Sequence, residues 1–288
     1  MSFQEAVESP RRPAYETVDT PDQVPRVGLV PIRGPGGQVL DAYRGVERED
    51  NHEIVSVVSS RYGLVGHREV ALAVHQVGQA LESPAEGELA SSFPRESIRL
   101  YSGGRRMEVK LVVGRKFHLA EGEDLFPGLR VLNSLDGSWA VRLSGFAVRV
   151  CCSNQLFAAA GNVVEWRELH LSSGSDLLSQ LRVAIHEFLD RFRDGLGLYT
   201  RSMQREILAD EVEPALLGQG FPQLHAGVIG ARAERQASHV GTLSRWSSYQ
   251  VATSYLTREL DVNPDRERFL ERAAARALLL PTQEGALA

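Results

Sequence analysis

A Gly-Gly dipeptide at 103–104 and an Asp-Gly dipeptide at 136–137 constrain the fold of this chain more than any other feature. Both are hairpin turn signals, and strand-forming residues flank each of them. If the first turn has two residues, Ser102 pairs with Arg105 and the pairing continues outward along both strands. Residues 95–155 therefore predict antiparallel hairpins, around which the rest of the chain is arranged.

Side chains alternate between the two faces of a strand, so this register divides the first hairpin into two faces. One face is apolar and is expected to lie in the core; it carries Ile98, Leu100, Met107, Val109 and Leu111. The other is expected to point outward as a basic surface with an aromatic in its middle; it carries Arg99, Tyr101, Arg106, Glu108 and Lys110.

The strand after the second turn changes its apolar phase. Apolar residues at 139, 141 and 143 alternate with smaller or polar ones, but beyond Gly145 they stand at 146, 148 and 150. A glycine at such a point is typical of a β-bulge or a bend. We therefore expect a curved strand that keeps Trp139 in the core and directs Arg142 and Arg149 outward.

Charge is unevenly distributed along the 288 residues. The formal net charge is −5, so no global positive field indicates a nucleic-acid partner. Residues 95–149 nevertheless contain 10 Lys and Arg against 6 Asp and Glu, which gives +4 there and leaves −9 for the remainder. The hairpin region is the basic part of an acidic chain.

The pattern of clustered strands followed by clustered helices predicts an α+β fold, with a curved antiparallel sheet backed by helices, a C-terminal helical region and a flexible N-terminal arm. Six prolines and a Gly-rich stretch predict extended or disordered backbone over residues 1–45, where 27–32 are suited to an edge strand. Strands are expected at 53–60 and 162–170, the first in the same sheet as 95–150. Helices are expected at 67–81, 176–210 with a break near 195–197, 242–260 and 265–280, and a loop at 218–230.

These elements indicate three parts. Residues 1–45 form the arm, and 46–260 form a single α+β domain with a sheet region at 53–170 and a helical region at 175–260. Residues 261–288 form a C-terminal helix and tail. No signal peptide and no apolar run of membrane-spanning length is recognisable, so we expect no membrane partner and a cytoplasmic location.

Catalytic and metal-binding motifs are not recognisable in the sequence. His186 and the glutamate after it resemble the start of a zinc-protease motif, but Asp190 stands where the second histidine belongs. The acidic cluster at 121–124 precedes a Pro-Gly turn and is interpreted as a solvated loop. The adjacent cysteines at 151–152 are interpreted as small buried residues at a strand end. We expect no catalytic residue, no metal, no cofactor and therefore no enzyme.

Three segments, at 57–70, 133–156 and 241–260, resemble a family of phage- and plasmid-encoded proteins described as domain of unknown function 932. The middle segment, with its Asp-Gly-Ser turn and its Arg-Val-Cys-Cys-Ser-Asn-Gln ending, is the most specific of the three. The resemblance spans about Asn51 to Leu260 and does not reach the N-terminal arm. It implies kinship and a genomic setting, because the family has no established activity to carry over.

The order of elements, a helix followed by curved antiparallel strands and a long helix, is similar to the core of single-strand annealing recombinases. Cations beside an aromatic suit single-stranded nucleic acid. We therefore expect a non-enzymatic protein that binds single-stranded DNA, promotes strand annealing and assembles into a homo-oligomeric ring or filament. The expected contact residues are Arg99, Tyr101, Arg105, Arg106, Lys110, Arg142 and Arg149.

Two alternatives remain open. The basic face is an ordinary surface if acids such as Glu108 pair with its cations. The chain is then a structural or regulatory interaction factor of a phage or plasmid that binds no nucleic acid, and its long helices contact the partner.

Overall fold

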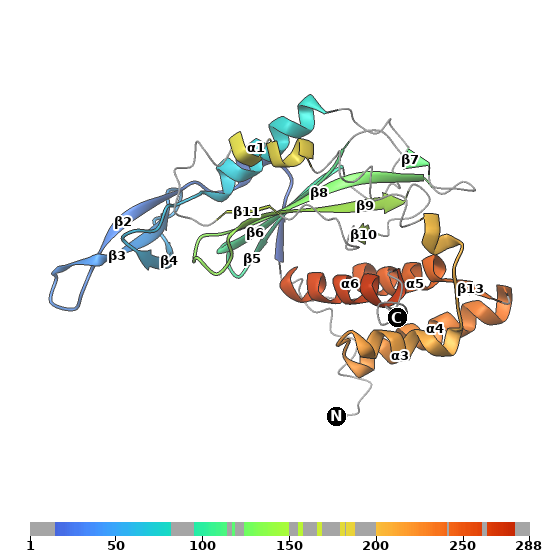
Figure 1. Cartoon of the computed structure of the whole chain (residues 1–288). Helices are drawn as coiled ribbons and strands as arrows, with labels where there is room; N and C mark the ends of the chain where they lie inside the picture. The colour runs from blue at the N-terminus through green and yellow to red at the C-terminus, as the bar shows by residue number, and fades with distance from the viewer. Residues whose placement is uncertain are drawn as a thin grey trace, which may run out of the picture.

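The computed structural model describes residues 15–81, 95–113, 117–118, 124–149, 155–157, 166–168, 179–181, 183–187, 200–240, 242–260 and 264–279. Within these ranges the chain has an α+β fold in which every strand pair is antiparallel. Figure 1 shows a large sheet with helices on both sides and a smaller sheet that projects from one end. The predicted fold class is confirmed.

Eight strands form the main sheet. They run in the order β1, β5, β6, β8, β9, β10, with β7 beside β8 and β11 beside β9. Their bounds are β1 Tyr15–Val18, β5 Glu96–Tyr101, β6 Arg106–Val112, β7 Phe117–His118, β8 Asp124–Ser134, β9 Val141–Arg149, β10 Gln155–Phe157 and β11 Trp166–Glu168.

The predicted register of the first hairpin is confirmed. Tyr101 pairs with Arg106, and the pairing continues without a shift to the far end of β5 and β6. The connection is a tight turn in which Ser102, Gly103 and Gly104 have φ of 55°, 67° and 80°. Two of these three left-handed positions are glycines, which adopt positive φ without a steric penalty.

The predicted bulge at Gly145 is wrong. The register between β8 and β9 continues unshifted from Leu125–Arg149 to Leu132–Arg142, through Gly145. The apolar phase changes for another reason. Residues 145–148 are all buried, so this end of β9 is covered on both faces and its apolar residues have no need to alternate.

Helix α1, His67–Ala80, covers one face of the main sheet, as the predicted helix at 67–81 required. Its buried residues include Val70 and Val74, and Gly78 lies directly against the side chain of Leu111 on β6. Figure 1 shows α1 on one side of the main sheet and α5 and α6 on the other. The strands of the main sheet therefore lie between two layers of helix.

A second sheet precedes α1, where an arm was expected. Its strands are β2 Val27–Arg33, β3 Val39–Arg48 and β4 Ile54–Ser59, in that order, after a short 3-10 helix, η1 Pro21–Gln23. We call it the N-terminal sheet. The strand expected at 27–32 is confirmed at an edge, but residues 15–45 are not disordered. The strand at 53–60 belongs to this sheet and not to the sheet of 95–150.

The C-terminal region is helical, with a two-stranded sheet between its helices. The elements are β12 Glu206–Ile207, α3 Ala209–Gly218, α4 Gln223–Val240, β13 Leu243–Ser244, α5 Arg245–Arg258 and α6 Pro264–Leu278. The helices predicted at 242–260 and 265–280 are confirmed. Residues of α6 share one core with the main sheet and α1, so α6 packs as part of the domain.

The loop predicted at 218–230 is wrong beyond Gln223, where α4 begins. Gly230, at the end of the predicted loop, is instead a helix residue at a close packing contact. A Cβ at Gly230 would stand 2.9 Å from the Cβ of Glu213 on α3. Residues 179–181, 183–187 and 200–203 are helical, as predicted for 176–210, but the prediction is wrong at 204–208, which include strand β12. The expected break near 195–197 and the cysteines at 151–152 lie outside the described residues.

Candidate functional site

Five of the seven expected contact residues lie on one face of the main sheet, which we call the arginine face. The confirmed register puts Arg99, Tyr101, Arg106 and Lys110 of the first hairpin on this face. Strand pairing extends the face across β8 and β9. Arg130 on β8 stands opposite Lys110. Arg142 on β9 stands opposite Leu132 of β8, and Leu132 in turn stands opposite Glu108 of β6. The sequence therefore grouped these five residues correctly. The grouping of Arg149 with Arg142 is wrong, because without a bulge two strand positions seven residues apart alternate to opposite faces.

Half of the arginine face is not outward. Tyr101 is 6% exposed beside the ring of Tyr15 on β1, 5.6 Å away between centroids. Lys110 is 3% exposed and Glu108 is fully buried, where Glu267 of α6 lies 3.9 Å from Lys110. The prediction that Tyr101 and Lys110 form an outward surface is wrong. A charged strand residue can lie in the core when a packed element supplies the opposite charge.

The opposite charges come from two glutamates one turn apart on α6. Arg130 Nη2 donates to Glu267 Oε2 at 2.8 Å, and its Nη1 lies 3.5 Å from Glu271 Oε2. Its Nε donates to Glu108, which also accepts from the Tyr101 hydroxyl at 3.1 Å. We call these five residues the buried ionic cluster, with Arg130 at its centre.

Two carboxyls of this cluster have pKa shifts of opposite sign. Burial alone would raise the pKa of Glu108, but the charges of Arg130, Lys110 and Arg99 outweigh burial and hold it well below its usual range. Burial, and next the charge of Glu267, raise the pKa of Glu271 well above its usual range. Neither oxygen of Glu271 has a hydrogen-bond partner within the described residues. Glu108 is thus the ionised member and Glu271 the member that favours its proton.

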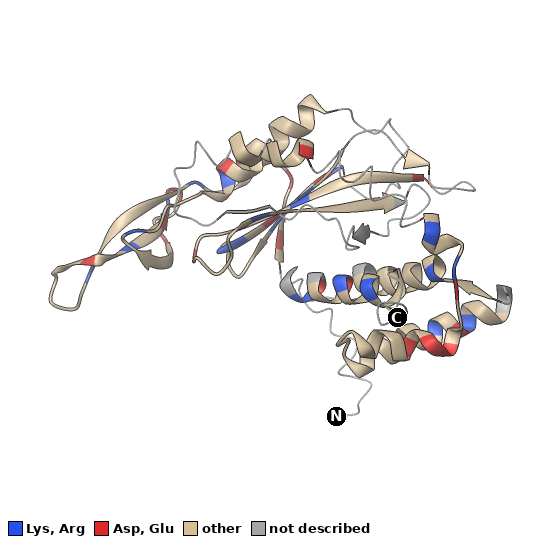
Figure 2. Ribbon diagram, in the orientation of Figure 1, with Lys and Arg blue, Asp and Glu red and all other residues tan. Residues whose placement is uncertain are grey.

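The other half of the face is open at the turn end of the strands. We call its three arginines, together with Arg105 in the adjoining turn, the arginine rim: Arg99, Arg105, Arg106 and Arg142. The side chains of Arg99 and Arg106 are 30% and 29% exposed, Arg105 in the turn is exposed, and Arg142 is partly exposed. Figure 2 shows Lys and Arg on the strands around the β5–β6 hairpin. The side chain of Arg149, the last predicted contact, lies outside the described residues.

Aromatic rings support two arginines of the rim. The guanidinium of Arg99 lies 4.5 Å from the ring centroid of Tyr15, and that of Arg106 lies 4.9 Å from that of Trp139. The Nε of Arg106 also donates to the Ser138 hydroxyl at 2.9 Å. Trp139 is 2% exposed, which confirms that it is a core residue. Its place in the core fixes the position of Arg106.

Sequence reasoning missed two residues of this region. Tyr15 was assigned to the arm, yet it pairs with Tyr101 as part of the edge strand β1. Arg130 was not singled out, although it is the largest fully buried side chain among the described residues. The sequence around Arg130 did not indicate its buried role, because β8 has the pattern of a hydrophobic strand with a single cation.

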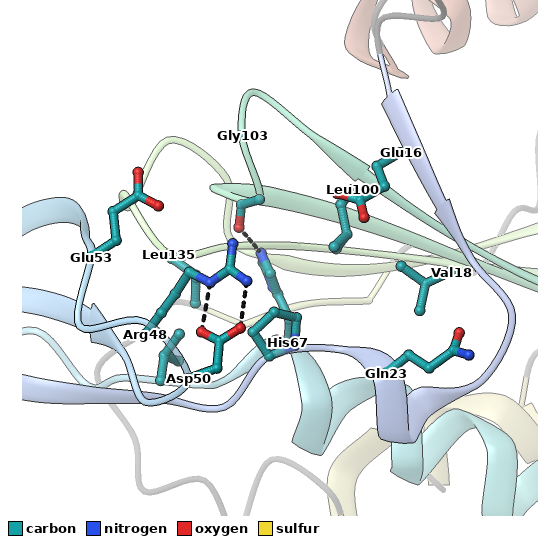
Figure 3. Close-up of a pocket in the computed structure, with 13 residues that line it drawn as sticks. Glu16, Val18, Gln23, Arg48, Asp50, Glu53, His67, Leu100, Gly103 and Leu135 are labelled. Atoms are coloured by element: carbon teal, nitrogen blue, oxygen red, sulfur yellow. Dashed lines mark hydrogen bonds and ion pairs between the residues drawn. The ribbon is translucent and has the colours of Figure 1, made fainter.

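A pocket of about 280 Å³ lies between the N-terminal sheet and the first hairpin (Figure 3). Arg48 and Asp50 face each other there through two hydrogen bonds of 3.0 and 2.7 Å. The carboxylates of Glu16 and Glu53 also line the pocket, so acids outnumber cations. This balance disfavours a phosphate as its ligand.

His67 at the pocket wall is structural. It is 2% exposed, its Nδ1 lies 2.9 Å from the amide nitrogen of Asn133, and its Nε2 lies 3.1 Å from the Gly104 carbonyl. An amide N–H can only donate and a carbonyl can only accept, so the ring is neutral with its proton on Nε2. His67 thereby ties α1 to the turn of the first hairpin.

The described ranges contain no group of three His, Cys, Asp or Glu side chains arranged to hold a metal ion. His186 and the following glutamate, which resembled the start of a zinc-protease motif, are exposed. Of the acidic cluster at 121–124, Asp124 is the first residue of β8 and forms an ion pair with His118, and residues 121–123 lie outside the described part. No helix in the described ranges is both long and apolar enough to cross a membrane.

Comparison with known proteins gives one match. No curated protein and no solved structure matches the chain. The family described as Domain of unknown function (DUF932) matches residues 54–277, from the start of β4 to the penultimate residue of α6. This range includes the arginine face and the helix that covers half of it. The chain therefore belongs to the DUF932 family.

Proposed function

We propose that the arginine rim binds single-stranded DNA. The observation that supports this most is that Arg99 and Arg106 rest on aromatic rings and are still part-exposed. An arginine held in this way loses little conformational entropy when it binds a phosphate or stacks on a base. Single strands suit such a surface because their bases are accessible for stacking.

The acids beside the rim leave its arginines available for phosphate. Asp136 lies 3.9 Å from Arg106, and Glu108 lies 3.9 Å from Arg99. These separations exceed a charge-assisted hydrogen bond of about 2.8 Å. Glu108 is moreover engaged by Arg130 in the buried ionic cluster. The rim therefore has a net positive charge facing solvent, in contrast to the pocket.

The rim is small, so one chain offers few phosphate contacts. Useful affinity then requires several linked copies, which raise the effective concentration of binding sites. We extend the proposal to a homo-oligomeric protein of phage or plasmid type that promotes strand annealing without catalysis. Annealing needs two strands held at once, and an assembly of several rims would hold them.

Fluorescence anisotropy of a labelled oligothymidylate, measured across a salt series, tests DNA binding. We expect wild-type binding to weaken steeply with salt, because cations at the rim displace counterions from the phosphates. Arg105→Glu combined with Arg106→Glu should abolish binding at moderate salt. A double reversal at two exposed arginines elsewhere, Arg201→Glu with Arg235→Glu, changes the net charge equally and should retain most of it.

Equal losses in the two double variants would show that net charge acts and the rim does not, which overturns the proposal. Absence of wild-type binding at low salt would also overturn it. Thermal unfolding of both double variants shows whether they fold, and Arg105→Ala with Arg106→Ala provides a milder pair. Removal of two phosphate contacts should lower the slope of log affinity against log salt by about 1.4.

A further inference from the structure

The strand β4 is an unprotected edge of the N-terminal sheet. Within the described residues it pairs with β3 alone, and the six residues Ile54–Ser59 contain no charge, no proline and no glycine. Ile54 and Val57 are 46% and 58% exposed. Exposed apolar edges of this kind are templates for a further strand.

The opposite edge of the same sheet is protected. Strand β2 contains Pro31, which has no N–H to offer a neighbour. A register shift does not distinguish the two edges, because the pairing shifts between Pro31 and Arg33 at β2 and between Val46 and Glu47 where β3 pairs with β4. Arg33 is the last residue of β2, and Arg26 directly precedes its first residue. These features prevent pairing at β2. A further strand would therefore add to β4.

The apolar surface of β4 continues across the sheet. Gly45 on β3 stands opposite Val57, and a Cβ at this glycine would lie 3.0 Å from Ile54 and 3.2 Å from Val30. These side chains therefore close over the glycine on one face. Tyr43, two residues before Gly45 on the same face, is 51% exposed. The edge and the adjoining face form one apolar surface.

The backbone of β4 also points the right groups outward. Ser60 N donates to Ala42 O at 2.9 Å, so in this register residues 56, 58 and 60 bond to β3. Hydrogen-bonding groups alternate along an antiparallel strand, and those of Val57 therefore point to the open edge. A strand added there would bond to Val57 at its centre.

We propose that β4 pairs with β4 of a second copy of this chain, antiparallel about a two-fold axis at Val57. Val57 then faces its own copy, Ser56 faces Val58, and no two like charges meet. The flanks are complementary as well: exposed Glu53 precedes β4 and exposed Arg61 follows it, in the turn closed by Tyr62 N donating to Ser59 O at 3.0 Å. An antiparallel pair therefore brings the acidic flank of each copy to the basic flank of the other. Opposite charges at the two ends of an uncharged strand favour self-pairing over an unrelated peptide.

Such a pair closes on itself, since a two-fold interface uses the same surface on both copies. The inference thus predicts a dimer as the basic unit, and a ring or filament would need a further contact. It is independent of the arginine rim, because self-association is measurable without DNA. A monomer that binds DNA and a dimer that does not are distinguishable outcomes.

Sedimentation equilibrium of the full chain tests this directly. We expect wild type to form a concentration-dependent dimer and Val57→Lys to be monomeric, because the two new lysines would meet at the axis. Leu224→Lys is the matched control: Leu224 is 75% exposed on α4, and its variant should dimerise like wild type. A monomeric wild type, or a dimer that Val57→Lys leaves intact, overturns the inference.

Charge exchange gives a second test that does not depend on how Val57→Lys folds. Glu53→Arg alone and Arg61→Glu alone should each weaken the dimer at least several-fold, because each puts like charges together at both ends. The double exchange restores opposite charges and should recover most of the wild-type affinity. Losses that add in the double variant would contradict the two-fold register.

Discussion

The two halves of the arginine face come from the same strands and differ in what lies over them. Under α6, Lys110 and Arg130 are buried beside glutamates. At the turn end, Arg99 and Arg106 lie on aromatic rings and reach solvent. A basic strand face is therefore no guide to a binding surface until the elements that cover it are known.

The comparison also separates two roles for arginine. Arg130 is surrounded by three glutamates and has the charge balance of a structural residue. Arg106 has an aromatic ring on one side and its nearest acid 3.9 Å away. Burial between acids serves folding, whereas support by a ring with an open side serves recognition.

The largest expected effect is on stability at the covered half. Arg130→Met should lower the free energy of unfolding by about 3–5 kcal/mol, because it leaves buried glutamates without their shared partner. The matched change at the rim, Arg106→Met, should cost less than about 1 kcal/mol because that side chain is partly solvated. Urea unfolding of both variants measures the difference. Equal losses would erase the distinction between the halves.

Trp139→Ala should have an effect of similar size. Loss of this buried ring should cost about 3–5 kcal/mol, as large core truncations do. It also removes the support of Arg106, so DNA affinity should fall even where the variant is fully folded. Binding measured well below the melting temperature checks this. Normal stability with lost binding would mean that Trp139 contacts the ligand itself.

A smaller effect is expected from Glu271 on the pH dependence of the free energy of unfolding. Its pKa is raised in the folded state, so its contribution to stability is present at low pH and is lost as pH rises through that raised value. Glu271→Gln mimics the protonated form and should be more stable than wild type once the pH exceeds the ordinary glutamate pKa. The difference should grow by about 1.4 kcal/mol for each pH unit up to the raised folded pKa and stay constant above it.

Urea unfolding of wild type and Glu271→Gln across a pH series provides the check, and the two curves should converge at acid pH. The pKa of Glu108 is shifted in the opposite direction. Because it is lowered in the folded protein, the contribution of Glu108 to stability is lost as pH falls through its folded pKa. If Glu271→Gln is less stable than wild type at every pH, Glu271 is ionised in the folded protein.

Local patterns predicted what local contacts decide. The glycine pair at 103–104 fixed the register of β5 and β6, apolar spacing located α1, and Arg- and Ala-rich composition located α6. The alternation of charge on β6 correctly grouped the residues of the arginine face. Each of these features depends on residues close together in sequence.

Long-range contacts explain what was missed. Arg130 and Glu267 are 137 positions apart, so nothing near β6 could indicate that α6 would cover it. Pro31 and Pro35 predicted disorder, but the first lies on an edge strand and the second in the turn between β2 and β3, where proline is tolerated. Composition alone could not distinguish these positions from a disordered arm.

Hydrogen–deuterium exchange with and without a single-stranded oligonucleotide tests the central claim most directly. The competing surface is the solvent side of α6, where Arg266 and Arg276 are exposed (Figure 2). We predict slower exchange at 102–106 and 136–142 when DNA is bound, and no change at 266–276. Protection of α6 without protection of the first hairpin turn would contradict the assignment of the arginine rim as the binding surface.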